Sequence, residues 1–154
     1  MMRRMKFTLG AVAAIALSTA AMASEVSPDA VEFTDDGVAV SLTGVAGDPA
    51  AGAETFKSRK LGNCLACHAN AAMSDEQFHG DVGPELDGVA SRWDEPQLRA
   101  IVVNSKQVFT DETIMPGFYS LEVGQHVAEK NVGQTILSAQ QVEDVVAYLG
   151  TLKE

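Results

Sequence analysis

Cysteine, basic residues and long apolar runs are all scarce in this chain of 154 residues. Only two cysteines are present, which excludes a small domain held together by several disulfides. The chain has 11 lysines and arginines against 21 aspartates and glutamates, so it lacks the clustered positive charge that binds nucleic-acid phosphates. No internal repeats are visible, and the length favours one compact domain.

The first 23 residues have the order of a secretory signal. Basic residues (Arg3, Arg4 and Lys6) precede the apolar stretch 7–17, and a small-residue tail ends at Ala23. Because that stretch is much shorter than the about 20 residues of a membrane-spanning helix, we predict export and cleavage after Ala23. An uncleaved anchor is the alternative.

Cleavage after Ala23 would remove three basic residues and no acidic residue, which changes the formal net charge from -10 to -13. An acidic protein of this kind can attract a basic protein partner at long range. Simple solubility explains the charge equally well.

Residues 24–47 are small, polar and acidic, with short apolar alternations around a turn signal at Asp36-Gly37. This composition predicts a hairpin-like or irregular N-terminal arm. Residues 48–154 then form the main domain.

Three helices are predicted in that domain. Asp48-Pro49 provides an N-cap and a first-turn proline for a helix over 50–60, which would end near the first cysteine. Asp94 begins a second helix that ends near Asn104. The third has a capping-box pattern at Ser138 and Gln141, followed by an apolar stripe of Val142, Val145, Val146 and Leu149.

Two long segments between these helices, 69–92 and 110–137, contain scattered glycine and proline and show no sustained periodicity. Loops of that length in compact domains are usually functional. We therefore expect a mostly α fold whose loops wrap around a prosthetic group.

The five residues Cys64-Leu65-Ala66-Cys67-His68 indicate what that group is. Covalent haem needs two thiols at a fixed separation for its vinyl groups and an imidazole for its iron, and Cys-x-x-Cys-His supplies all three. A dithiol redox pair would be preceded by a strand within a βαβ pattern, which is not visible, and zinc would need further ligands such as His79 and His126. We predict one haem c attached through Cys64 and Cys67, with His68 as iron ligand.

The sixth iron ligand decides between electron transfer and small-molecule chemistry. After cleavage the candidates are Met73, Met115, His79 and His126. Met115 is favoured because it lies 47 residues beyond His68 in a long polar loop and is followed by Pro-Gly. A thioether there would raise the reduction potential and fill the site, which favours outer-sphere electron transfer.

Three alternatives remain for this sixth position. His126 could be the ligand in place of Met115, or Met115 could simply fill a gap in the core. An open site would instead make the protein a haem enzyme or a gas sensor.

Further residues are candidates for supporting roles around the haem. The carbonyl of Pro84 could accept the second ring N–H of His68 and so orient the imidazole. Arg92, Trp93 and Lys60 carry N–H donors that suit haem propionates. Each is equally consistent with an ordinary turn, packing or surface role.

From Asn63 to its C-terminus the chain resembles the SoxX family, the monohaem cytochrome subunit of the SoxAX complex in bacterial thiosulfate oxidation. The stretches that carry the resemblance are 62–68, 82–90, 103–106, Met115-Pro116 and 141–149. The resemblance implies a class I cytochrome c-like fold, haem thioethers at Cys64 and Cys67, and His68 and Met115 as axial ligands. Residues 24–50 resemble the family less.

The resemblance also implies a function and a partner. A SoxA-like cytochrome subunit would hold the active-site haem of an L-cysteine S-thiosulfotransferase, which couples thiosulfate oxidatively to a cysteine of a sulfur-carrier protein. This chain would have no catalytic site of its own and would pass electrons to a soluble cytochrome c in the periplasm. A free-standing periplasmic electron carrier is the alternative.

Overall fold

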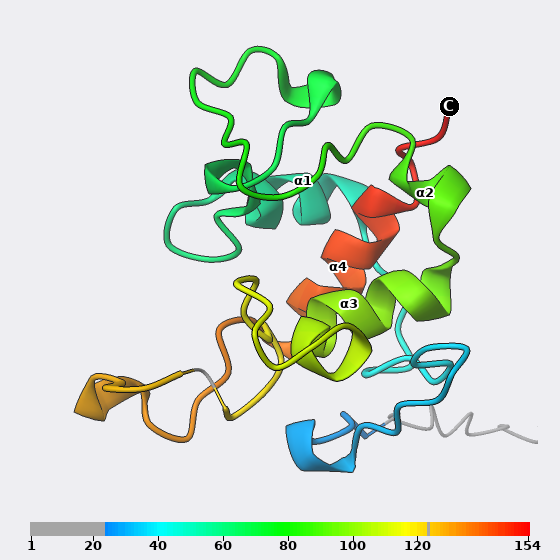
Figure 1. The fold of residues 1–154 in the computed structure, drawn as a ribbon. Coiled ribbons are helices and arrows are strands. Elements are labelled where there is room, and N and C mark those ends of the chain that lie inside the picture. The colour runs from blue at the N-terminus through cyan, green and yellow to red at the C-terminus, as the bar shows by residue number, and fades with distance from the viewer. Residues whose placement is uncertain (1–23, 123) are drawn as a thin grey trace, which may run out of the picture.

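A computed structural model describes residues 24–122 and 124–154, so the predicted signal peptide lies outside the described residues. Within these described ranges, four α-helices form the body of the structure (Figure 1): α1 (Pro49–Lys57), α2 (Val89–Arg92), α3 (Glu95–Val108) and α4 (Ala139–Leu149). The same described residues form four single-turn 3₁₀ helices, of which η1 (Pro28–Ala30) lies in the N-terminal arm and η2 (Cys64–Ala66), η3 (Ala71–Met73) and η4 (Glu129–Asn131) lie in loops between the α-helices.

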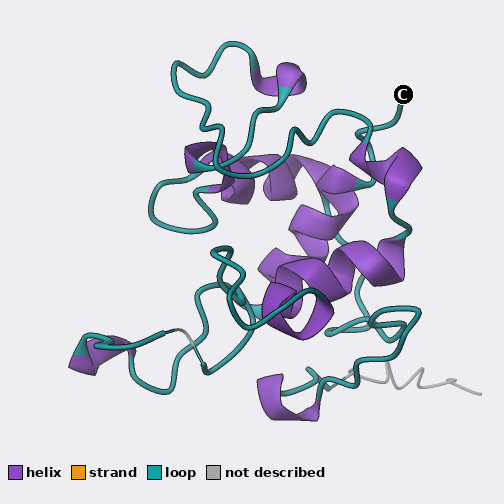
Figure 2. Ribbon diagram, viewed as in Figure 1, coloured by secondary structure: helices purple, strands orange, loops and turns teal. Residues whose placement is uncertain are grey.

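The prediction of a mostly α fold is confirmed (Figure 2). Within the described ranges no strand forms, and the arm contains only one isolated bridge, between Thr34 and Gly37. That bridge encloses Asp35 and Asp36, so the turn lies one residue before the predicted Asp36-Gly37, and the rest of the arm is irregular. No helix in the described part of the chain is both long and apolar enough to cross a membrane.

The predicted caps account for where the helices begin. The Asp48 side chain accepts a hydrogen bond from the amide of Ala50 at the start of α1. Reciprocal capping boxes start α3, between Asp94 and Gln97, and α4, between Ser138 and Gln141. The starts of all three helices are therefore set by local sequence.

The ends of the first two helices differ from the predictions. Helix α1 ends at Lys57, three residues before the predicted end, because the next residue is extended and its carbonyl accepts from Leu61 and Asn63 in a turn toward the first cysteine. Helix α3 is interrupted at Asn104, which has φ -156° and ψ 93°, but resumes and continues to Val108. The short helix α2 lies in a segment that was predicted to be loop.

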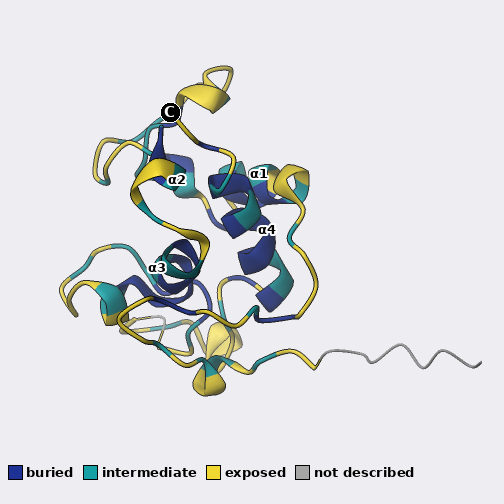
Figure 3. Ribbon diagram, turned by 90° about the vertical axis from the view of Figure 1, so that its right-hand side faces the viewer, coloured by how far each residue is buried: buried dark blue, intermediate teal, exposed yellow. Residues whose placement is uncertain are grey.

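The two ends of the domain pack together through α1 and α4, which lie side by side (Figure 3). Gly52 makes this close crossing possible, because a Cβ there would overlap the backbone of Asp144. Next to it, the rings of Phe56 and Tyr148 meet edge to face at 5.4 Å. The apolar stripe predicted for α4 is buried in the core, together with inward-facing residues of α3.

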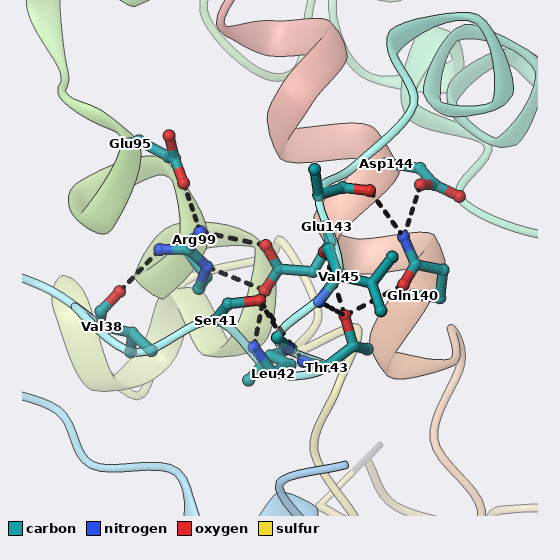
Figure 4. A network of polar contacts seen from close by, with 12 residues as sticks. Val38, Ser41, Leu42, Thr43, Val45, Glu95, Arg99, Gln140, Glu143 and Asp144 are labelled. Carbon is teal, nitrogen blue, oxygen red and sulfur yellow. Dashed lines mark hydrogen bonds and ion pairs between the residues drawn. The ribbon is translucent and has the colours of Figure 1, made fainter. Parts of the chain in front are cut away.

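A buried ion pair fastens the N-terminal arm to this helical body (Figure 4). Arg99 of α3 and Glu143 of α4 are 3% and 4% exposed, and they pair through two hydrogen bonds of 2.9 and 3.0 Å. Arg99 also donates to the carbonyl of Val38, while Glu143 accepts from the amide of Leu42. Each buried charge thus also satisfies a backbone group of the arm.

Burial alone would lower the pKa of Arg99. Its hydrogen bonds and charge interactions with Glu143 and Glu95 outweigh that effect and raise the pKa above its ordinary value. The guanidinium therefore stays charged. In this charged state it keeps its hydrogen bond to the Val38 carbonyl of the arm.

Candidate functional site

A cavity of about 840 Å³ lies between the cysteine motif, helices α3 and α4, and the loop that carries Met115. Its walls are largely apolar, and its volume is within the range of pockets that hold cofactors. The structure brings together Cys64, Cys67, His68 and Met115, which all line this cavity. The four residues predicted from the sequence to bind the haem thus line the same cavity.

Local backbone geometry places the motif on one wall. Asn63 adopts the left-handed conformation, with φ 50°, and turns the chain into η2. Within this turn the amides of Cys67 and His68 both bond to the carbonyl of Cys64, at 3.1 and 3.0 Å. Both thiols and the imidazole are consequently carried by a single tight turn.

Cys64 and Cys67 form no disulfide, and both are half-buried. Burial raises the pKa of Cys64 to about 12. The reactive thiol of a redox pair has a lowered pKa, and Cys64 shows no such lowering. In addition, among residues 24–122 and 124–154 no group of three or more His, Cys, Asp or Glu side chains could hold a metal ion.

The predicted hydrogen bond between His68 and Pro84 is confirmed. The Nδ1 atom of His68 lies 2.7 Å from the Pro84 carbonyl oxygen. Because a carbonyl only accepts, Nδ1 must carry the proton, which leaves the lone pair of Nε2 available to a metal. The amide of Gly83 bonds to the carbonyl of Cys67 at 2.8 Å, so the returning loop runs beside the motif and positions Pro84.

Among the four candidates for a sixth ligand, Met115 is the one that lines the cavity. Met73 and Met115 both pack partly buried against the hydrophobic core, but Met73 does not line the cavity. Both ring nitrogens of His79 are already used, by the amide of Asn70 and the carbonyl of Met73, and His126 is exposed with φ 57°. The geometry thus favours Met115 over the other three.

The three residues predicted as possible donors to the haem propionates do not all line the cavity. Arg92 and Trp93 line the cavity, but Arg92 already donates to the carbonyls of Glu85 and Asp87, at 2.8 and 2.7 Å. Lys60 is exposed and is not part of the lining, whereas its neighbour Arg59 is. Sequence reasoning missed Arg59, although its closeness to the motif was a usable signal.

Comparisons with known proteins agree with this geometry. The cytochrome c family profile matches residues 49–153. The crystal structure of SoxXA from P. pantotrophus contains a chain that is 42% identical, with a TM-score of 0.78 over 85% of this chain and 100% of that chain. No curated protein sequence matches significantly.

Two more distant structures were also found. The c-type cytochrome SorU from Sinorhizobium meliloti is 26% identical over 68% of this chain and 90% of its own, with a TM-score of 0.44. Cytochrome c2 from Paracoccus denitrificans is 21% identical over 70% of this chain and 97% of its own, with a TM-score of 0.39.

The chain therefore belongs to the cytochrome c family. Within that family it is a SoxX-type monohaem cytochrome with a class I cytochrome c-like fold, as the sequence predicted. Its cofactor is one covalently attached haem c, and the large apolar cavity lined by two cysteines and by an imidazole with an available Nε2 fits that group.

Proposed function

We propose that Cys64 and Cys67 hold the haem through thioethers and that His68 and Met115 are its axial ligands. The observation that carries this assignment is that the four side chains line one cavity, with the Nδ1 proton of His68 engaged by Pro84. When bound, the haem supplies an iron that cycles between the ferric and ferrous states. The chain would bind the group, its apolar walls would exclude water, and His68 and Met115 would leave no position open on the iron, which suits electron transfer.

The attachment is tested by replacing the thiols. The wild-type protein should retain haem after denaturation, with the mass of one haem added to the chain. The double variant Cys64→Ala, Cys67→Ala should show no covalently bound haem. Covalent haem in that double variant would contradict the assignment.

The protein serves as the electron-transfer subunit of a SoxAX-type L-cysteine S-thiosulfotransferase, in a heterodimer with a SoxA-like cytochrome. The 42% identity to a chain of SoxXA over 85% of the sequence supports this role. Coupling thiosulfate to a carrier thiol forms a sulfur–sulfur bond, releases the thiol proton and leaves two electrons. With its haem bound, this chain would accept these electrons one at a time and pass them to a soluble cytochrome c.

Export to the periplasm follows from the N-terminal sequence pattern and from the chemistry of haem attachment outside the cytoplasm. The mature protein would begin at Ser24 after cleavage behind Ala23. N-terminal sequencing of the periplasmic fraction tests this position, and an intact Met1 would contradict it.

Co-expression with the SoxA-like subunit distinguishes this function from that of a free-standing carrier. The expected result is a stable heterodimer whose haem on this chain is reduced by thiosulfate only when the partner and the sulfur carrier are both present. A protein that stays monomeric beside the partner and serves unrelated oxidases equally well would be a free-standing electron carrier.

A further inference from the structure

Asn104 interrupts α3 next to the cavity, which the preceding Val102 lines. In a continuous helix the amide of Lys106 would bond to the carbonyl of Val102. Here that amide donates to the side-chain Oδ1 of Asn104, at 3.2 Å. Asn104 thus acts as the N-cap of the last turn of α3, a role for which asparagine is well suited.

The segment after Met115 binds to the two carbonyls that come just before this interruption. The amide of Phe118 donates to Val102 and that of Tyr119 to Val103, each at 3.1 Å. The chain leaving Met115 is therefore joined by backbone hydrogen bonds to the helix that forms one wall of the cavity.

Ser105 and Lys106, the two residues after the interruption, hold the other side of the same loop. The hydroxyl of Ser105, which is fully buried, donates to the carbonyl of Met115 at 2.7 Å. The ammonium of Lys106 donates to the carbonyl of Asp111, at 3.2 Å, and to that of Thr113. Charge-assisted bonds of this kind are stronger than bonds between neutral groups.

We propose that Asn104, Ser105 and Lys106 are positioning residues that hold the thioether of Met115 at the iron. Lys106 holds the loop before Met115, Ser105 holds the Met115 carbonyl, and the interruption at Asn104 adjoins the carbonyls that hold the loop after it. None of the three lines the cavity itself. This inference rests on the proposed ligation by Met115. A looser loop should let external ligands compete with the thioether for the iron, although the Met115 side chain is still present.

The test compares Lys106→Gln with Lys106→Arg and with Lys130→Gln in the holoprotein. Lys130 is an exposed lysine on η4, so its replacement changes the net charge equally. Imidazole binding to the ferric protein should be about tenfold tighter for Lys106→Gln, the factor expected from losing a hydrogen bond to a charged group. Lys106→Arg keeps a charged donor and should stay closer to wild type than the glutamine variant, and Lys130→Gln should match wild type.

Ser105→Ala gives a second and independent readout, because it removes the bond to Met115 itself. It should weaken the long-wavelength absorption band of methionine-ligated ferric haem and tighten imidazole binding. Urea unfolding of both variants separates this local effect from a general loss of stability. Wild-type imidazole affinity in both folded variants would overturn the inference.

The same experiment separates failure of this inference from failure of the proposed ligation. If wild-type protein lacks the long-wavelength band, Met115 is not the ligand and both ideas fall. If wild type has the band and neither variant changes it or the imidazole affinity, the ligation stands and the positioning role is wrong.

Discussion

His68 donates its Nδ1 proton to the carbonyl oxygen of Pro84 across 2.7 Å, and the residue between motif and proline that permits this contact is Gly83. A Cβ at position 83 would overlap the imidazole ring. Gly83→Ala should therefore displace the ring and weaken its bond to iron. We expect a lower yield of holoprotein and loss of the low-spin visible spectrum, measured as haem content per chain.

Gly150→Ala is the matched control for this prediction. An added Cβ there would lie 3.4 Å from its nearest neighbours, an ordinary contact, and the backbone at Gly150 is helical. Haem content should stay at the wild-type level in this control. Equal haem content and equal spectra in both variants would refute the proposed need for glycine at position 83.

Glu143→Leu should destabilise the protein by about 3–5 kcal/mol, because it leaves the buried charge of Arg99 without its principal partner. It also removes the acceptor for the amide of Leu42, so the N-terminal arm should become sensitive to protease. Urea unfolding and limited proteolysis measure the two effects.

Glu95→Gln serves as the comparison, since Glu95 contacts the same arginine but its side chain is 71% exposed. Exposed ion pairs contribute about 0–1 kcal/mol. If both substitutions lowered the free energy of unfolding equally, burial would not be what makes the Arg99–Glu143 pair important for stability.

Tyr119 should make the stability of the protein fall at alkaline pH. Burial, together with the hydrogen bond and charge of Glu25, raises the pKa of Tyr119 to about 12 from the ordinary value of 10.0. Between these values the folded state holds a proton that the unfolded state has lost, so the stability contributed by Tyr119 is complete below about pH 10 and declines toward pH 12.

Urea unfolding at stepped pH, on wild type and Tyr119→Phe, measures this contribution. The stability difference between the two proteins should be largest below about pH 10 and should shrink above it. A difference that is constant across this range would contradict the raised pKa.

Local signals in the sequence account for much of the fold. Asp94 and Ser138 start helices α3 and α4 as predicted, because a capping side chain acts on amides only two or three residues away. The sequence predicts only a helix end near Asn104, because the hydrogen bonds of Phe118 and Tyr119 to the helix around it come from a separate loop. The pairing of Arg99 with Glu143 likewise joins residues 44 apart and left no periodic signal.

In the candidate site, too, local features could be predicted from the sequence and features that depend on the tertiary structure could not. Cys64, Cys67 and His68 could be recognised because their spacing encodes the chemistry within a single turn. Pro84 was also anticipated, since a carbonyl acceptor for the proximal imidazole is a general requirement. Arg59 and the loop-holding bonds of Ser105 and Lys106 were not anticipated, because they depend on where the cavity and the loop come to lie in three dimensions.

The optical spectrum of the ferric holoprotein, wild type against Met115→Leu, tests most directly whether this chain is a six-coordinate electron carrier. The wild type should show the long-wavelength band of methionine-ligated haem and bind carbon monoxide slowly when reduced. Met115→Leu should lose the band and bind carbon monoxide rapidly. A variant that keeps the band, or a wild type that lacks it and binds carbon monoxide rapidly at neutral pH, would contradict the account.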